Sequence, residues 1–176
     1  TKSIIEKKSF KPNYYGAVAV RTQIKAKVVS RFKTENISIF MSSKAHLVSY
    51  PINDSRDINL VCILRKKLND KKSIEQLLNK NFFNNNKHLP NFFNEDLKSW
   101  SIFTSLNPVK SVLKNVFYIG DAFYSYPPTF AQGASQSIES AKQLYDLLIE
   151  DKQNIGNTYF EKRLEKTVMI NNRSRL

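Results

Sequence analysis

The residues best suited to chemistry lie close together in the last third of the chain. An apolar run at residues 116–119 is followed at once by Gly120 and Asp121, then by Pro127 and Pro128, and an amphipathic stretch opens at the triplet Gln132-Gly133-Ala134. An apolar run that stops at a glycine predicts a buried strand ending in a tight turn. The prolines then end regular structure, because proline fixes φ and lacks a backbone donor.

Asp121 and the start of the following helix are the groups that could hold a ligand. Ligands in open α/β sheets bind beyond the carboxyl ends of the strands, where the carboxylate of Asp121 would accept hydrogen bonds from sugar or polyol hydroxyls. The helix predicted after Gly133 begins with unpaired N–H groups and the positive end of a dipole. Each feature alone is also typical of ordinary packing. Their order indicates a site for a ligand with hydroxyls at one end and an anionic or carbonyl group at the other.

The order Gly-Asp-Ala, Pro-Pro and Ala-Gln-Gly-Ala, before a helix with an acidic residue in its second turn, resembles a known motif. It is similar to the second flavin-binding motif of the FAD-dependent aromatic hydroxylases, the class A flavoprotein monooxygenases. These include salicylate hydroxylase-like and ubiquinone-biosynthesis hydroxylase-like enzymes. The positions that the resemblance implies for FAD binding are Gly120, Asp121, Pro128, Gln132, Gly133 and Ala134.

The resemblance also implies roles. Asp121 would bind the ribityl chain, the backbone of Gln132, Gly133 and Ala134 would receive the pyrimidine edge of the flavin, and Pro128 would line the flavin near the substrate. NADH or NADPH would reduce FAD, and one atom of molecular oxygen would pass to an aromatic or other electron-rich substrate. Many family members have histidine where this chain has Tyr124, which leaves the substrate side open, and no side chain is assigned as a catalytic acid or base.

The first hundred residues predict a sheet. Residues 1–15 are polar and basic and predict an irregular leading segment, whereas residues 16–24, 37–42, 45–52 and 58–64 are rich in β-formers and predict four strands. Ser43-Lys44 predicts a tight hairpin, and short connections predict antiparallel pairing. In the hydroxylases that this order resembles, such a sheet belongs to the substrate domain and covers the flavin ring.

Helices are predicted at residues 73–83, 90–97, after Gly133, and at 157–169, with a strand at 100–106 and a frayed end at 170–176. In the helix after Gly133 the apolar face comprises Ala134, Ile138, Ala141, Tyr145 and Leu148. In the last helix it comprises Tyr159, Phe160, Leu164 and Val168. Phe92, Phe93, Tyr124 and Tyr126 are aromatic candidates for a substrate pocket, and packing is the alternative for each of them.

The Gly-x-Gly-x-x-Gly loop that holds the FAD pyrophosphate is not in the sequence, which has four glycines, Gly16, Gly120, Gly133 and Gly156. The chain therefore resembles the carboxyl-terminal portion of a flavin hydroxylase. The predicted fold class is α+β or α/β, with an antiparallel substrate-domain sheet at residues 1–108. The last strand and helices of an incomplete Rossmann-like FAD-binding domain follow at 109–176. The amino-terminal half is an implied partner.

Composition limits the alternatives. The net charge of +13 comes mostly from lysines spread along the chain, without an arginine-rich cluster, so nucleic acid is not the predicted partner. Cys62, the single cysteine, is expected in the core and excludes an intrachain disulfide. His46 is expected to be structural rather than to face a cavity, His88 lies in a predicted loop, and no metal site is expected. Without a membrane-spanning run or secretion signal, the chain is predicted to be cytoplasmic.

Two functions follow from these patterns. The first is an FAD-dependent, NAD(P)H-using monooxygenase, present here as a fragment that binds the flavin ring and ribityl chain. The alternative is a non-catalytic fragment, or a basic binding module without a cofactor. An isolated portion would also expose a sheet edge and helix faces that the other half covers, which predicts poor solubility.

Overall fold

The computed structural model describes residues 2–28, 36–80, 97–105, 107–128, 131–150 and 153–173. The chain divides into two compact units, which are described separately. One, here called the sheet unit, is Gly16–Ile102. The other, here called the helical unit, combines Thr1–Tyr15 with Phe103–Leu176. The predicted domain division at residues 1–108 and 109–176 stays a prediction.

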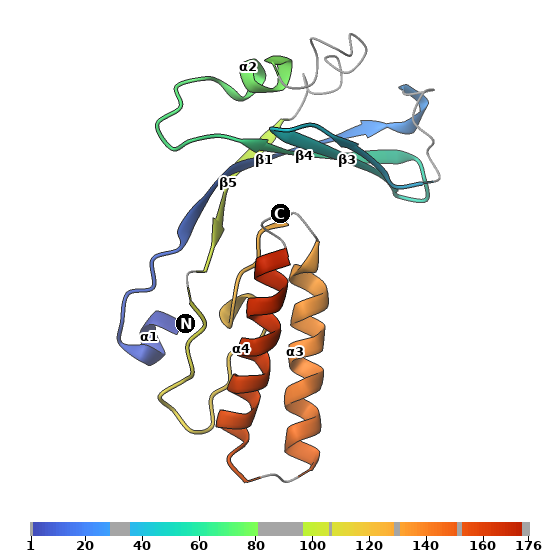
Figure 1. Cartoon of the computed structure of the whole chain (residues 1–176). Coiled ribbons are helices and arrows are strands. Elements are labelled where there is room, and N and C mark those ends of the chain that lie inside the picture. Colours follow the sequence, from blue (N-terminus) through green and yellow to red (C-terminus); the bar gives the residue numbers. More distant parts are fainter. Residues whose placement is uncertain are drawn as a thin grey trace. The chain divides into compact units, whose positions relative to one another are not determined.

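The sheet has five strands in the order β2-β3-β4-β1-β5 (Figure 1). The strands are β1 (Asn13–Lys25), β2 (Ser38–Met41), β3 (Ala45–Ile52), β4 (Asp57–Arg65) and β5 (Lys98–Thr104). The pairs β1 with β4, β2 with β3 and β3 with β4 are antiparallel. The predicted α+β class with an antiparallel sheet is therefore confirmed.

One face of the sheet forms an aliphatic core with the short helix α2 (Ile74–Leu78), which lies over it (Figure 1). Alternate residues of three strands point into this core, because successive side chains in a strand face opposite ways. The buried members are Val18, Val20, Ala45, Leu47, Ile58, Leu60, Cys62 and Leu64, together with Leu77 and Leu78 of α2. Ser73 begins α2 with a capping box, accepting from Gln76 N–H while the Gln76 side chain accepts from Ser73 N–H.

The predicted strands are confirmed, with changes at their ends. The third matches β3 at both bounds, and the Ser43-Lys44 hairpin is present, with Ser42 N–H donating to the Ala45 carbonyl at 2.8 Å. The first begins at Asn13 rather than Gly16, so part of the predicted irregular leading segment is strand. The predicted strand at 100–106 is shifted to Lys98–Thr104 and lies beside β1.

The helical unit contains α1 (Lys2–Glu6), the 3-10 turn η4 (Gly120–Ala122), α3 (Gln132–Ile149) and α4 (Ile155–Arg173). The two long helices α3 and α4 run side by side (Figure 1). Three residues of the stretch before α3, Tyr118, Phe123 and Tyr124, form a cluster of buried aromatic side chains, and Phe160 of α4 packs against it. This cluster is the core of the unit.

The prediction that residues 1–15 lack a core role is wrong. Residues 2–6 form α1, and Glu6 is buried. Its Oε1 accepts hydrogen bonds from the Tyr118 hydroxyl at 2.7 Å and from Val112 N–H at 3.3 Å. Buried carboxylates require such partners, so this helix is tied to the aromatic core.

The predicted strand at residues 116–119 is also wrong. The segment is irregular, although its last residue, Ile119, has extended dihedral angles (φ −121°, ψ 160°). A strand is stabilised by a neighbouring strand, and among the described residues none pairs with this segment. The apolar pattern indicated extended backbone but does not supply a partner.

The amphipathic face predicted for α3 is reversed. The residues that α3 buries are Gln136, Ser140 and Leu147. The predicted apolar face points to solvent: Ile138 is 71% exposed, Tyr145 58% and Leu148 51%, and both Ala134 and Ala141 are exposed. In α4 the buried residues are Tyr159, Arg163 and Thr167, and the predicted face residue Val168 is exposed.

Boundaries of the other predicted helices differ as well. The last helix starts at Ile155, two residues before its predicted start, and continues to Arg173 through part of the predicted frayed end. The helix predicted at 73–83 is α2, and residues 81–83 lie outside the described residues. The helix predicted at 90–97 lies outside them for all but its last residue, as do His88, Phe92 and Phe93.

Candidate functional site

The Gly120-Asp121 turn is fixed against α3. Gly120 has φ +53°, and a Cβ built on it would lie 2.5 Å from the Ser137 Oγ and 3.1 Å from the Ser137 Cβ. Its N–H donates to the Ser140 Oγ at 3.1 Å, and that hydroxyl donates to the Ser137 carbonyl at 2.8 Å. A side chain at this position would be strained by both conformation and space, so only glycine suits the turn.

Asp121 is exposed at the second position of this turn. Within the described residues, its carboxylate has no hydrogen bond or ion pair of its own. An ionised carboxylate is an acceptor with several lone pairs, so this group is available to ligand hydroxyls. The turn that fixes Gly120 therefore also determines where this acceptor stands.

The amino terminus of α3 lacks a side-chain cap. Ala131, at the N-cap position, has left-handed dihedral angles (φ 50°, ψ 31°) and makes no side-chain hydrogen bond to the helix. The first turn of an α-helix has N–H groups without intrahelical partners, here including those of Gly133 and Ala134. A Cβ built on Gly133 would meet nothing within 4 Å, so the space beside this backbone is open. The helix start fits a carbonyl or anionic group.

The residues between Asp121 and the start of α3 differ in exposure. Pro127 is fully buried and Pro128 is exposed, so only the second proline offers a surface to a ligand. Tyr124 is 3% exposed and packs edge-on against Tyr126 with ring centroids 4.9 Å apart. The Tyr126 hydroxyl donates to Thr167 Oγ1 at 2.9 Å. Tyr124 is thus a core residue of the helical unit.

A buried arginine of α4 contacts the side chains of α3. Arg163 of α4 is 2% exposed, and its Nη2 donates to the Gln136 Oε1 at 2.9 Å while Nη1 lies 3.4 Å from the Glu139 Oε1. Lys166 also contacts that carboxylate at 3.3 Å, and although burial works in the opposite direction, these contacts leave the pKa of Glu139 below its usual value. The network couples the two helices.

The supporting contacts of these residues were not predicted from the sequence. Ser137, Ser140, Gln136 and Arg163 carry no apolar signal, and none of the first three belongs to the apolar face predicted for this helix. One signal was available in the spacing of Gly133, Ser137, Ser140 and Leu147, which places all four on one face of the helix. The first three are small, and small residues on a helix face allow another backbone to approach closely.

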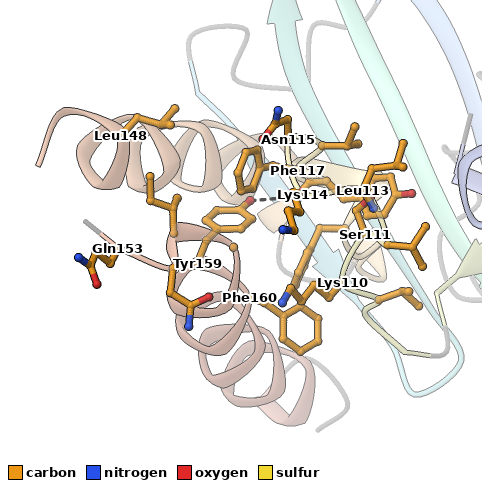
Figure 2. A pocket seen from close by; sticks show the side chains of 18 residues that line it. Lys110, Ser111, Leu113, Lys114, Asn115, Phe117, Leu148, Gln153, Tyr159 and Phe160 are labelled. Carbon is orange, nitrogen blue, oxygen red and sulfur yellow. Dashed lines mark hydrogen bonds between the residues drawn. The ribbon is translucent and has the colours of Figure 1, made fainter. Parts of the chain in front are cut away.

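A cavity of the helical unit lies away from the Gly120-Asp121 turn and the start of α3. It has a volume of about 900 Å³ and is lined by residues 109–118, Phe123, Leu148, residues 153–156, Tyr159 and Phe160 (Figure 2). The Tyr159 hydroxyl donates to the Tyr118 carbonyl at 2.9 Å, and the Phe117 and Tyr159 rings meet edge to face. Lys110, which lines the cavity, donates a hydrogen bond to the Asn157 side chain. None of the residues predicted to bind FAD lines this cavity.

In the sheet unit, the thiol of Cys62 is fully buried, and burial raises its pKa to about 12. It is a packed core residue without thiolate character, as predicted. His46 is half-buried, and burial lowers its pKa, which favours the neutral ring. In the described part of the chain, no cluster of three or more His, Cys, Asp or Glu side chains could hold a metal ion.

The fold has known counterparts. Residues from both units align with Klebsiella pneumoniae HpxO complexed with FAD and uric acid, with a TM-score of 0.71 at 13% identity. The alignment with CtdE in complex with FAD and substrate 4 has a TM-score of 0.75 at 15% identity. The alignment with a salicylate hydroxylase substrate complex has a TM-score of 0.73 at 17% identity. This chain has the fold of FAD-dependent hydroxylases.

The likeness covers nearly all of this chain and about half of each counterpart. It spans 99% of the chain and 46% of HpxO, 99% and 49% for CtdE, and 95% and 47% for salicylate hydroxylase. This agrees with the predicted resemblance to one portion of a flavin hydroxylase. No family model matches the chain. No curated protein matches it by sequence. Among the described helices, none is long and apolar enough to cross a membrane.

Proposed function

We propose that this chain is the flavin-ring portion of an FAD-dependent monooxygenase that acts on a small aromatic or other electron-rich substrate. The carrying observation is the pair of ligand-binding groups beside α3: an exposed carboxylate without a partner in the described residues and a helix start without a side-chain cap. The carboxylate is suited to the hydroxyls of the ribityl chain of a flavin, and the helix start is suited to the carbonyls of its pyrimidine edge.

Each predicted residue has a defined task in this proposal. Asp121 accepts hydrogen bonds from the ribityl hydroxyls, and Gly120 permits the turn that presents it. The N–H groups of Gly133 and Ala134, with the α3 dipole, favour negative charge at the pyrimidine edge. Gln132 belongs to the same first turn, and Pro128 offers an exposed apolar surface beside the flavin.

Bound FAD, reduced by NADH or NADPH, would supply the activation of molecular oxygen for transfer of one oxygen atom to the substrate. The chain's own contribution is to bind and orient the cofactor. None of the described side chains is proposed as acid or base. A cytoplasmic location, where NAD(P)H is present, belongs to the same proposal.

The proposal includes a second polypeptide segment, the amino-terminal FAD-binding half. Two features of the helical unit support it: the outward apolar residues of α3 and the segment 116–119, which no described strand pairs. Exposed apolar surface of this kind is typical of an interface. The alternative function, a basic binding module without a cofactor, has the net charge of +13 in its favour.

Flavin fluorescence titration tests the proposal. Because the chain has no Gly-x-Gly-x-x-Gly loop for the pyrophosphate, its contacts are to the ring and ribityl chain, and FAD and riboflavin should bind equally well. Asp121→Ala should weaken both by about tenfold, the loss typical of a hydrogen-bonded charged group. Asp146→Ala is the matched control, since Asp146 pairs with Lys142 on α3. Equal binding by all three proteins, or none at millimolar flavin, would refute the site.

A further inference from the structure

The loop between β4 and α2 in the sheet unit concentrates positive charge (Figure 1). Although most lysines are spread along the chain, residues 65–72 read Arg-Lys-Lys-Leu-Asn-Asp-Lys-Lys, with five basic residues and one acidic residue. No other eight consecutive residues of the sequence carry as many basic side chains. Basic segments of this kind bind anionic partners, either nucleic acids or lipid surfaces. The structure of the loop decides between these partners.

Hydrogen bonds within the loop occupy one lysine and the one acidic side chain. The Lys66 Nζ donates to the carbonyls of Asp70 and Lys72, the second at 2.9 Å. The Asp70 Oδ1 accepts from Lys72 N–H at 3.0 Å, and this bond is the main reason that the pKa of Asp70 lies below its usual value. Both Lys66 and Asp70 are partly buried. Their charges therefore serve the shape of the loop.

The other four basic side chains of the loop are exposed. They are Arg65, Lys67, Lys71 and Lys72, here called the outward cations. Within the described residues, none of these four side chains has a hydrogen bond or an ion pair. The Lys44 carbonyl accepts from Arg65 N–H at 2.9 Å, so a further exposed lysine lies beside the start of the loop. This part of the sheet unit thus presents several cations without a matching anion.

An apolar side chain lies at the tip of the loop. Asp70 N–H donates to the Lys67 carbonyl at 3.0 Å, which closes a turn with Leu68 and Asn69 at its two central positions. Leu68 is 75% exposed, and basic residues flank the turn on both sides. A surface that attracts the outward cations therefore meets Leu68 as well.

A bilayer with anionic lipids suits both kinds of side chain. Its headgroups attract clustered basic residues, and its hydrocarbon accepts an apolar side chain that lies among them. Nucleic acid fits less well, because the loop has no aromatic residue on which a base could stack. Lysine also acts as a point charge, which suits mobile headgroups better than a fixed bidentate contact.

We propose that this loop docks the chain on an anionic lipid surface, with the outward cations against the headgroups and Leu68 inserted between them. Anionic lipids are characteristic of the cytoplasmic leaflet, which agrees with the proposed cytoplasmic location. The inference goes beyond the proposed function, because it concerns a surface of the sheet unit and needs no flavin.

The test is co-sedimentation of the 176-residue chain with lipid vesicles. Vesicles of phosphatidylcholine and phosphatidylserine in equal amounts should bind the chain about tenfold more tightly, or better, than vesicles of phosphatidylcholine alone. Added salt should weaken this binding, because it screens exposed charges. The combined variant Lys67→Gln, Lys71→Gln and Lys72→Gln should bind about a hundredfold more weakly, since each cation near such a surface contributes about fivefold.

A matched variant removes the same amount of charge outside the loop. Lys8→Gln, Lys114→Gln and Lys162→Gln together change three exposed lysines of the helical unit. This variant should bind anionic vesicles within about threefold of the unchanged chain, because exposed charges more than about 8 Å from the headgroups are screened at physiological salt.

Leu68→Ser separates a lipid surface from other anionic partners. It should weaken binding to anionic vesicles by about tenfold and keep the salt dependence, because it removes the apolar contact and no charge. Equal binding to both kinds of vesicle, no binding to either, or equal losses in the two lysine variants would overturn the proposal. Binding of duplex RNA that depends on the loop lysines, with no effect of Leu68→Ser on vesicles, would assign the loop to nucleic acid instead.

Discussion

The sheet unit and the helical unit bury their side chains in opposite ways. The sheet unit places aliphatic residues of three strands beneath α2, and Val20, Leu60, Cys62 and Leu64 have no exposed surface. The helical unit has an aromatic core, while the contact between α3 and α4 uses Gln136, Glu139 and Arg163. Ile138, Tyr145 and Leu148 of α3 point outward instead.

An apolar pattern in the sequence shows that a segment can be buried, but it does not show whether the chain contains a partner that buries it. The strands of the sheet unit have such partners, because they pair with one another and pack against α2. The predicted apolar face of α3 is exposed, and residues 116–119 have no strand to pair with among the described residues. The stability of the sheet unit should therefore depend on apolar side chains, whereas the contact between α3 and α4 should depend on polar ones.

The largest expected effect is in the sheet core. Leu60→Ala should lower the free energy of unfolding by about 3 kcal/mol, because it leaves a cavity at a fully buried site. The same change at Leu148 of α3, which is about half exposed, should cost about 0.5 kcal/mol or less. Urea denaturation followed by circular dichroism measures both. Similar losses at the two sites would contradict the contrast between the units.

The next effect concerns the polar contact of the helical unit. Arg163→Leu should destabilise it by about 2 kcal/mol, since the Gln136 Oε1 loses its buried donor. Lys166→Ala is the control. Lys166 and Arg163 both contact the Glu139 carboxylate, but Lys166 is more exposed, so its removal should cost about 0.5 kcal/mol. Thermal unfolding of both variants gives the comparison. A stabilised Arg163→Leu variant would show that the helices prefer an apolar contact.

A smaller effect is expected at the turn that presents Asp121. Gly120→Ala should cost about 1 to 2 kcal/mol, because an alanine there is strained at positive φ and crowds Ser137. Pairing it with Ser137→Gly, which removes the crowding hydroxyl, should recover part of that loss. Denaturant unfolding of the single and double variants measures the recovery. No recovery would mean that the backbone conformation alone requires glycine.

The smallest effect on stability should come from the exposed face of α3. Ile138→Ser with Tyr145→Ser should change the free energy of unfolding by about 0.5 kcal/mol or less, since both side chains are mostly exposed. The same variant should reduce self-association in sedimentation experiments, because it removes exposed apolar surface. A strongly destabilised variant would mean that this face is packed in solution.

The sequence predicted the elements whose partners lie within the chain. The bounds of β3 were predicted correctly, since its alternating residues pair with β2 and β4. Residues 116–119 were not, because regular strand needs a partner that no local pattern reveals. The buried face of α3 was missed for a related reason: Ser140 and Gln136 are polar, and only tertiary hydrogen bonds explain their burial.

The residues proposed for flavin binding were chosen from the sequence, and their role stays a prediction. They are Gly120, Asp121, Pro128 and the Gln132-Gly133-Ala134 triplet, and the structure places the Gly120-Asp121 turn directly against α3. The support by Ser137 and Arg163 was not predictable.

The most direct measurement is the amide NMR spectrum of the isotope-labelled chain, recorded with and without riboflavin. Binding as proposed should shift the amide signals of Gly120, Asp121, Gly133 and Ala134 and leave those of Tyr118 and Tyr159, which line the separate cavity, unchanged. Saturating shifts at the cavity with none at the first turn of α3 would contradict a flavin site at that helix. They would assign the ligand to the aromatic cavity instead.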